Sequence, residues 1–331
     1  MTNNLRILGA QHIRDALEGK ETEIIELVKK TYLLHSAGKS SLPQSIFLRF
    51  PKDDRNRIIG LPAYLEDENR IAGMKWISSF PGNIENGIER ASASIFLNEM
   101  DTGRVTAVLE GSIISAKRTA ASAALAAGYL HGNKDESSVG LVGCGRINRE
   151  ILLFLESVFP KLSRVFLYDM SDDRMDAFIG AHKDTKLEFI KCSDIEEVFG
   201  GARLVSFATT AGVPFIDEIK NLTNEHTVLG ISLRDFAPAV IKRVHNIVDD
   251  LEHVCRERTS IHLTYEETKS KDFVAGSIAD VVNHKVPARD KDKACIYSPF
   301  GLGVLDLALS DYVYREALRT DAGTVVENFL P

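Results

Sequence analysis

Three basic side chains stand where they could hold an anionic small molecule. Lys75 interrupts the apolar run Gly73-Met-Lys-Trp-Ile77, so its ammonium group must reach water or meet an anion. Arg49 ends another apolar run, and Arg118 lies at the beginning of a helical pattern. Arginine binds planar carboxylates through two parallel hydrogen bonds, and lysine adds a point charge. The three cations therefore suggest a carboxylate site, although each alone could be an ordinary surface charge.

Asp235 is the acidic residue best placed for proton transfer. It follows an apolar run that ends near Ile231, at the carboxyl edge of the expected sheet. There it could accept a proton from a substrate amine or position a water molecule. Aspartate is also a favoured helix cap, so Asp235 could instead cap a helix over Phe236–Val240. Spacing alone leaves both readings open.

A glycine pair lies between an apolar run and an amphipathic helix, in Val139–Asn148. This arrangement is typical of a Rossmann unit, in which Gly143 permits the tight turn and Gly145 lets the backbone approach a pyrophosphate. Arg146 and Ile147 open the helix and are expected beside the cofactor. The third position of the fingerprint is asparagine, so the motif is degenerate.

A second apolar run, Arg164–Tyr168, ends in Asp169 about 20 residues further on, as a dinucleotide-binding unit requires. Its carboxylate could accept both hydroxyls of the adenosine ribose and would repel a 2′-phosphate. NAD is therefore the expected cofactor, rather than NADP. The alternative is a βαβ unit that binds no nucleotide and carries a surface aspartate.

Strand and helix patterns alternate over residues 121–304, which predicts a parallel sheet and an NAD-binding Rossmann domain. The sequence Ser193-Asp-Ile-Glu196 predicts a capping box before one crossover helix. Thr209 and Thr210 follow the fourth strand and Ser232 ends the fifth, where ligands bind in such sheets. The expected strands are 139–143, 164–168, 187–191, 203–208, 227–233, 245–248 and 294–298.

Residues 1–120 do not alternate in this way. Two helical patterns precede a series of strand-like runs, and Met100–Arg104 is a good hairpin turn. We expect an antiparallel sheet with helices packed on it, of α+β type. The segment 305–331, a helix and a tail, is expected to return to this domain and make it discontinuous. A helix over Ile114–Leu130 would join the two domains, with the ligand between them. The overall fold class is α/β.

Composition narrows the possible partners. The chain has 331 residues, 44% of them hydrophobic, and a net charge of −7 without acidic or basic blocks. Nucleic acid and anionic membranes are therefore not expected as partners. Four scattered cysteines, no apolar leader and no long apolar run predict a cytoplasmic protein with reduced thiols. The nine histidines show no metal-ligand spacing, so no metal is expected. Cys144, in the glycine loop, is interpreted as a packing residue.

In combination, these motifs resemble the ornithine cyclodeaminase/μ-crystallin family. The resemblance rests on Gly73-x-Lys-Trp76, Ser115-x-x-Arg-Thr-Ala-Ala121, the glycine pair and Asp235, and it extends to Ser298–Asp306 near the end. It implies an NAD(P)-dependent homodimer that acts on carbon–nitrogen bonds of amino acids. It also implies that Arg49, Lys75 and Arg118 hold the substrate α-carboxylate. Asp235 is then the acid/base group, with Lys75 beside it in the catalytic set. Thr209, Thr210, Ser232 and Leu302 line the cofactor.

The Ile88–Ser92 segment and the Lys75–Ser79 run resemble dehydrogenases of this family whose substrate carries several carboxylates. Arg90 is the candidate for an additional carboxylate contact, although it could equally pair on the surface. Two alternatives remain: a cyclodeaminase or imino-acid reductase on the same fold, and a non-catalytic NAD-binding protein.

Overall fold

The computed structural model describes residues 3–331, with the side chain of residue 54 excepted. Residues 1 and 2, part of the polar start of the chain, lie outside the described range. The chain forms two compact units. The first unit comprises Met1–Arg118 and Leu302–Pro331, and the second comprises Thr119–Gly301.

The first unit is built on one mixed sheet with strand order β16-β1-β7-β6-β5-β4-β2, and β3 also pairs with β4. Its strands are β1 (Leu5–Leu8), β2 (Ser40–Ser41), β3 (Ile46–Phe50), β4 (Asp53–Glu66), β5 (Arg70–Ser79), β6 (Ala91–Asn98), β7 (Val105–Glu110) and β16 (Thr324–Val326). Its helices are α1 (Ala10–Leu17), α2 (Glu21–Ser36), the 3-10 helix η1 (Pro81–Asn86) and α11 (Gly303–Thr320). Helix α3 (Gly111–Leu130) begins in this unit and continues into the second.

The expectation of a purely antiparallel sheet was wrong at one edge. Strand β1 pairs with β7 in parallel, and the expected C-terminal tail contains β16, which pairs antiparallel with β1. These strands are only four and three residues long, so they show too little alternation to be read from sequence. Their pairing also depends on segments at opposite ends of the chain.

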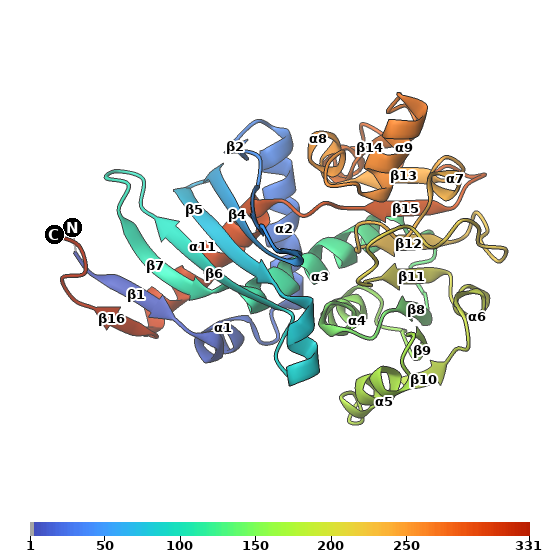
Figure 1. Ribbon diagram of the computed structural model, residues 1–331, viewed down its shortest axis with the longest axis horizontal. Helices are drawn as coiled ribbons and strands as arrows, with labels where there is room; N and C mark the ends of the chain where they lie inside the picture. Colours follow the sequence, from blue (N-terminus) through green and yellow to red (C-terminus); the bar gives the residue numbers. More distant parts are fainter. Residues whose placement is uncertain (1–2) are drawn as a thin grey trace. The chain divides into compact units, whose positions relative to one another are not determined.

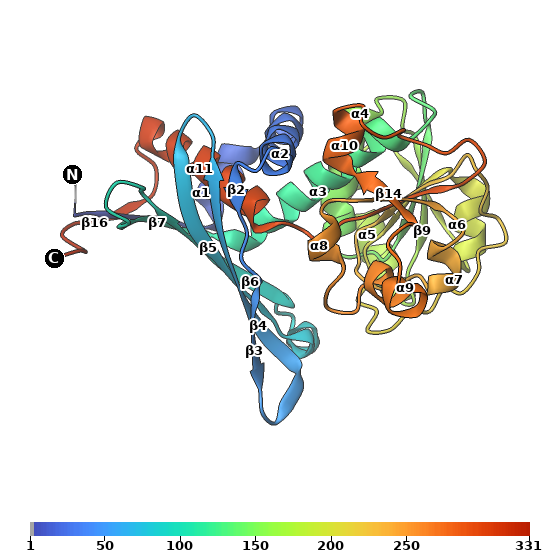
Figure 2. The same ribbon diagram turned by 90° about the horizontal axis from the view of Figure 1, so that it is seen from above.

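Helix α11 packs on β4, β5 and β6, on the face of the sheet that Figure 2 shows covered by helices. Close approach is possible because position 73 has no side chain: a Cβ on Gly73 would lie 2.1 Å from the carbonyl oxygen of Phe96 and 2.8 Å from Leu307. Residues 303–309 at the start of α11 are all buried, and Asp306 is the polar side chain among them. This helix therefore carries one carboxylate into the core of the first unit.

The second unit contains an all-parallel sheet with strand order β10-β9-β8-β11-β12-β15-β13-β14 (Figure 1). The strands are β8 (Ser138–Val142), β9 (Arg164–Tyr168), β10 (Glu188–Lys191), β11 (Leu204–Phe207), β12 (Thr227–Gly230), β13 (His245–Val248), β14 (Val274–Ser277) and β15 (Cys295–Ser298). The helices are α4 (Arg146–Val158), α5 (Asp172–Gly180), α6 (Ile195–Gly201), α7 (Pro238–Ile241), α8 (Leu251–Val254), α9 (Ser260–Thr268) and α10 (Ile278–Val282). This confirms the Rossmann-type sheet.

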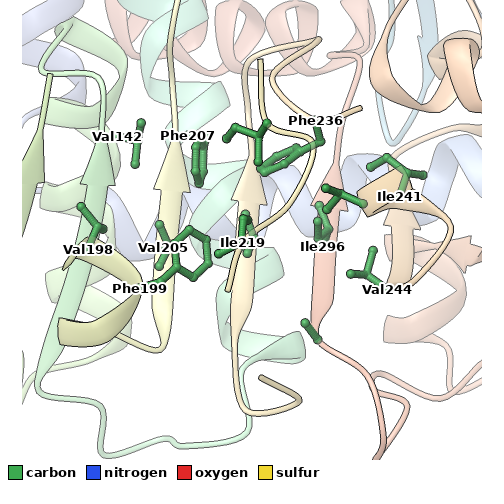
Figure 3. Close-up of a cluster of buried hydrophobic side chains, with 14 of the residues drawn as sticks. Val142, Val198, Phe199, Val205, Phe207, Ile219, Phe236, Ile241, Val244 and Ile296 are labelled. Carbon is green, nitrogen blue, oxygen red and sulfur yellow. The ribbon is translucent and has the colours of Figure 1, made fainter. Parts of the chain in front are cut away.

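The central strands of this sheet are buried throughout, as expected for a parallel sheet covered on both faces. Figure 3 shows one of the resulting cores, in which Val142, Val205 and Phe207 from the strands meet Val198 and Phe199 of α6. The carboxyl ends of these strands therefore have a rigid base.

Two sequence-based expectations about helix caps are corrected. Helix α6 is capped by Asp194, whose side chain accepts from the N–H of Glu197, and not by Ser193. Helix α7 begins after Ala237, with Pro238 in its first turn, so Asp235 is not its cap. Among the described residues, no helix is both long and apolar enough to cross a membrane.

Candidate active site

A buried ion network in the first unit joins two of the predicted cations. Lys75 Nζ lies 2.7 Å from one carboxylate oxygen of Asp306, and Arg118 Nε lies 3.1 Å from the other. Both cations also donate to Ser115 Oγ, at 3.1 and 3.3 Å. Strand β5, helix α3 and helix α11 each contribute to this network. Asp306 thus fixes the two basic side chains side by side.

Burial and the neighbouring charges shift the pKa values of Lys75 and Asp306 in this network. Burial lowers the pKa of Lys75 to about 8, with a further lowering by Arg118 and an opposing effect of Asp306. Burial would raise the pKa of Asp306, but the charges of Arg118 and Lys75 hold it below its ordinary value. The network therefore contains one anion and two cations near neutral pH. Its net positive charge suits a carboxylate ligand.

Asp306 is the functional residue that sequence analysis did not single out. The sequence does contain a signal for it, because Asp306 is a single carboxylate among the apolar residues 303–309. A buried carboxylate needs a cationic or hydrogen-bonding partner. Its partner Lys75 is 231 positions away in sequence, so spacing could not identify the pair.

The other two predicted cations lie further along the same sheet. Arg49 on β3 pairs in register with Arg57 on β4, which in turn pairs with Ser79 on β5. Arg90 donates to Ser79 Oγ at 3.2 Å. Ser79 is four residues from Lys75 and on the same face of β5. The row of paired positions that contains Arg49, Arg57 and Ser79 therefore lies about 14 Å along the strands from the row that contains Lys75. Arg49 is thus grouped with Arg90 rather than with the Lys75 network.

In the second unit, the glycine loop between β8 and α4 has the geometry that a pyrophosphate requires. Gly143 has a φ of 93°, and a Cβ there would lie 2.6 Å from the carbonyl oxygen of Ala208. A Cβ on Gly145 would meet nothing within 4 Å, so the backbone is open to a ligand. Gly145 caps α4 without a side-chain hydrogen bond, and Arg146 and Ile147 form the first turn. The helix N-terminus therefore offers N–H groups to an anion.

Asp169 follows β9 and contacts this loop directly. One carboxylate oxygen accepts from the N–H of Cys144 at 2.8 Å, and the other accepts from the N–H of Ser171 at 3.1 Å. Each oxygen keeps a free acceptor position, so the carboxylate can still bind two ribose hydroxyls. Burial raises the pKa of the Cys144 thiol to about 12, so this cysteine is not an activated nucleophile. These residues fit an NAD adenosine.

Asn148 explains the degenerate glycine motif. Its side chain is fully buried, and its amide group donates to the carbonyl oxygens of Val142 and Gly143 at 3.0 and 2.8 Å. Its own carbonyl oxygen accepts from Ser206 Oγ at 2.8 Å. The asparagine therefore ties the glycine turn to two strands, in place of the close packing that a third glycine permits.

The carboxylate of Asp235 lies with two predicted cofactor-lining residues. Thr209 Oγ1 donates to one of its oxygens and Ser232 Oγ to the other, while Ser232 Oγ also accepts from the N–H of Thr209 at 3.1 Å. Asp235 is fully buried, and burial raises its pKa despite these two hydrogen bonds. A buried carboxyl group whose pKa is raised takes up a proton more readily than an exposed one. Thr210, the next predicted residue, is exposed.

The turn after β15 is fixed by a buried aspartate that the sequence did not reveal. Asp249 accepts from the N–H groups of Phe300 and Gly301, at 2.9 and 2.7 Å. Gly301 has a φ of 92°, and Leu302 is the buried cap of α11 in the first unit.

Comparison with known proteins gives the family. The model of the ornithine cyclodeaminase/mu-crystallin family matches residues 12–321, and the chain belongs to this family. It is 28% identical to an N-((2S)-2-amino-2-carboxyethyl)-L-glutamate dehydrogenase of Staphylococcus aureus, over 98% of this chain and 99% of that protein.

Two solved structures share the fold. A Thermococcus litoralis Delta(1)-pyrroline-2-carboxylate reductase, in complex with NADH and L-proline, superposes with a TM-score of 0.87 at 24% identity, covering 96% of this chain and 99% of that chain. An archaeal alanine dehydrogenase dimer with bound NAD superposes with a TM-score of 0.86 at 23% identity, covering 98% and 99%. The fold expectation is thereby confirmed.

Proposed function

We propose that this protein is an NAD-dependent dehydrogenase that cleaves N-[(2S)-2-amino-2-carboxyethyl]-L-glutamate to 2-oxoglutarate and L-2,3-diaminopropionate. The observation that carries the proposal is the paired Lys75 and Arg118 on Asp306, a preformed cationic site for an amino-acid carboxylate. The full-length similarity to the S. aureus dehydrogenase supports this choice of substrate. The product serves biosynthesis that uses 2,3-diaminopropionate, such as siderophore biosynthesis.

NAD is the proposed cofactor, held by the glycine loop and by Asp169. When bound there, NAD would supply the hydride acceptor for the glutamyl Cα, and loss of the hydride would leave an iminium bond between Cα and the secondary nitrogen of the substrate. Lys75 and Arg118 hold the α-carboxylate and so fix the orientation of Cα, whereas Arg49 lies in the row of Arg57 and Arg90. The clamp residues belong to the first unit, and the dinucleotide loop and Asp235 belong to the second.

Asp235 completes the reaction by proton transfer. Water adds to the iminium carbon, and the carboxylate of Asp235 takes the proton that the water loses. The resulting carbinolamine expels the diaminopropionate nitrogen as the carbonyl group of 2-oxoglutarate forms. The raised pKa of Asp235 suits a group that must hold this proton and return it.

The test is the Asp235→Asn variant. We expect NAD binding to be retained and kcat to fall about 100-fold or more, because an amide cannot take up the proton. NADH formation and 2-oxoglutarate release would be followed with the aminocarboxyethyl-glutamate substrate, and Asp217→Asn, an exposed aspartate of the same unit, is the matched control. Full activity of Asp235→Asn would remove it from the mechanism.

Proline and ammonia formed from ornithine would identify a cyclodeaminase instead. Tight NAD binding without turnover of any amino acid would indicate a binding protein.

A further inference from the structure

A row of arginines crosses the first-unit sheet beyond the Lys75 network. Arg49, Arg57 and Ser79 occupy paired positions on β3, β4 and β5, so their side chains share one face of the sheet. The paired position on the next strand, β6, is Ala91, and the residue before it, Arg90, reaches back to Ser79. Three guanidinium groups are thus brought to one end of these strands.

The position of Arg90 is fixed by both backbone and side chain. Its carbonyl oxygen accepts from the N–H of Phe80 at 2.8 Å, which closes the loop that contains η1. Its guanidinium group donates to the buried Ser79 Oγ. Arg49 stacks on the ring of Phe47, with its guanidinium carbon 5.4 Å from the ring centre. These arginines are therefore held in place before any ligand arrives.

Arg57 and Arg90 are close enough to repel each other. Burial lowers the pKa of Arg90, and the positive charge of Arg57 lowers it further. Within the described part of the chain, no acidic side chain forms an ion pair with Arg57 or Arg90. Two neighbouring, partly buried guanidinium groups without such a partner are destabilising unless an anion binds between them.

We infer that Arg57 and Arg90 form a second carboxylate subsite, which selects substrates that carry a distal carboxylate in addition to the α-carboxylate. The inference rests on the proposed function and assigns to Arg57 a role in specificity. Lys75 and Arg57 lie on the same face of the sheet, with about 14 Å between their rows of Cα positions, and long lysine and arginine side chains can shorten this separation to the span of a ligand with carboxylates at both ends. The distal carboxylate of a glutamate-derived substrate has the required charge and planar shape.

The experiment compares two 2-oxo acids in the reductive direction, with NADH and 2,3-diaminopropionate. The first, 2-oxoglutarate, carries the distal carboxylate, and 2-oxobutyrate lacks it. For Arg57→Gln we expect kcat/KM for 2-oxoglutarate to fall by about 10- to 100-fold and that for 2-oxobutyrate to change by less than about twofold. Arg90→Gln should show the same pattern, and Arg55→Gln, an exposed arginine two residues away, is the matched control. Equal losses with both oxo acids, or none with either, would overturn the inference while the proposed function stands.

A binding measurement separates failure of the subsite from failure of the proposed reaction. Thermal stabilisation of the protein by glutarate and by butyrate is recorded for the wild type and for each variant. The subsite is supported if glutarate raises the melting temperature of the wild type more than butyrate does and if Arg57→Gln loses this difference. The melting temperature of the variant without ligand should equal that of the wild type. This result supports the subsite even if neither oxo acid is turned over. A wild type that does not distinguish glutarate from butyrate, or an Arg57→Gln variant that still does, contradicts it.

Discussion

At Lys75, burial and the neighbouring charges act in opposite directions on one ammonium group. Burial and Arg118 favour its neutral form and Asp306 favours its charged form, with a resulting pKa of about 8. An ordinary lysine keeps its charge to well above pH 10. Lys75 is thus a cation that can lose its charge within the working range of an enzyme, and that should weaken its hold on a carboxylate.

This leads to a prediction for the pH dependence of catalysis. Because the charged form exists below the pKa, kcat/KM for the amino-acid substrate should fall about tenfold per pH unit above about pH 8. The KM for NAD should stay nearly constant over the same range, since Lys75 lies outside the glycine loop. Initial rates between pH 6.5 and 10 provide the measurement. A profile for the amino acid that stays flat up to pH 10 would contradict this role of the lysine.

At the scale of elements, the turn from β8 into α4 depends on the side chain of Asn148, at a position where the usual dinucleotide-binding fingerprint has glycine. Asn148 makes three hydrogen bonds, and all of them lie inside the protein. Asn148→Ala would leave the hydroxyl of Ser206 and two carbonyl oxygens without this partner. The carbonyl oxygen of Val142 still accepts from the N–H of Ala208, so Gly143 and Ser206 carry the loss, at a cost of about 1–3 kcal/mol.

We therefore predict that Asn148→Ala lowers the free energy of unfolding by about 2 kcal/mol and weakens NAD binding. Urea denaturation and titration with NAD would measure the two effects. Asn148→Gly, which restores the usual glycine, should not recover stability, because it restores no hydrogen bond. Recovery by glycine would show that space, rather than hydrogen bonding, matters at this position.

Sequence patterns predicted the elements well where those were long or strongly periodic. The strands around the glycine loop, the hairpin at Met100–Arg104 and helix α2 follow from local periodicity and turn chemistry. The short strands β1, β14 and β16 do not, because β1 and β16 pair through segments at opposite ends of the chain and β14, Val-Ala-Gly-Ser, is not an apolar run. Among site residues, Gly143 and Asp169 were readable because they lie in one local unit. Asp306 and Arg57 were not, because their significance comes from neighbours that the fold alone provides.

At the scale of the whole molecule, the sheet of the first unit has a second face with a different character. Ile46, Gly60 and Trp76 pair across β3, β4 and β5, and Leu48 lies in the next row of the same face. Ile46, Leu48 and Trp76 are exposed at 62%, 44% and 37%. A cluster of large apolar side chains on a sheet face marks an interaction surface. The expected homodimer would cover it.

The dimer can be tested at this face because Trp76 is the only tryptophan in the chain. Burial of its indole in an interface should shift the fluorescence emission to shorter wavelength as the protein concentration rises. The double variant Ile46→Glu with Leu48→Glu should abolish this shift and halve the mass in light scattering, because two carboxylates would have to lose water in the interface. Leu153→Glu, an exposed apolar position on α4, should leave the mass unchanged. If the double variant keeps the wild-type mass, the prediction that this apolar face joins two subunits is wrong.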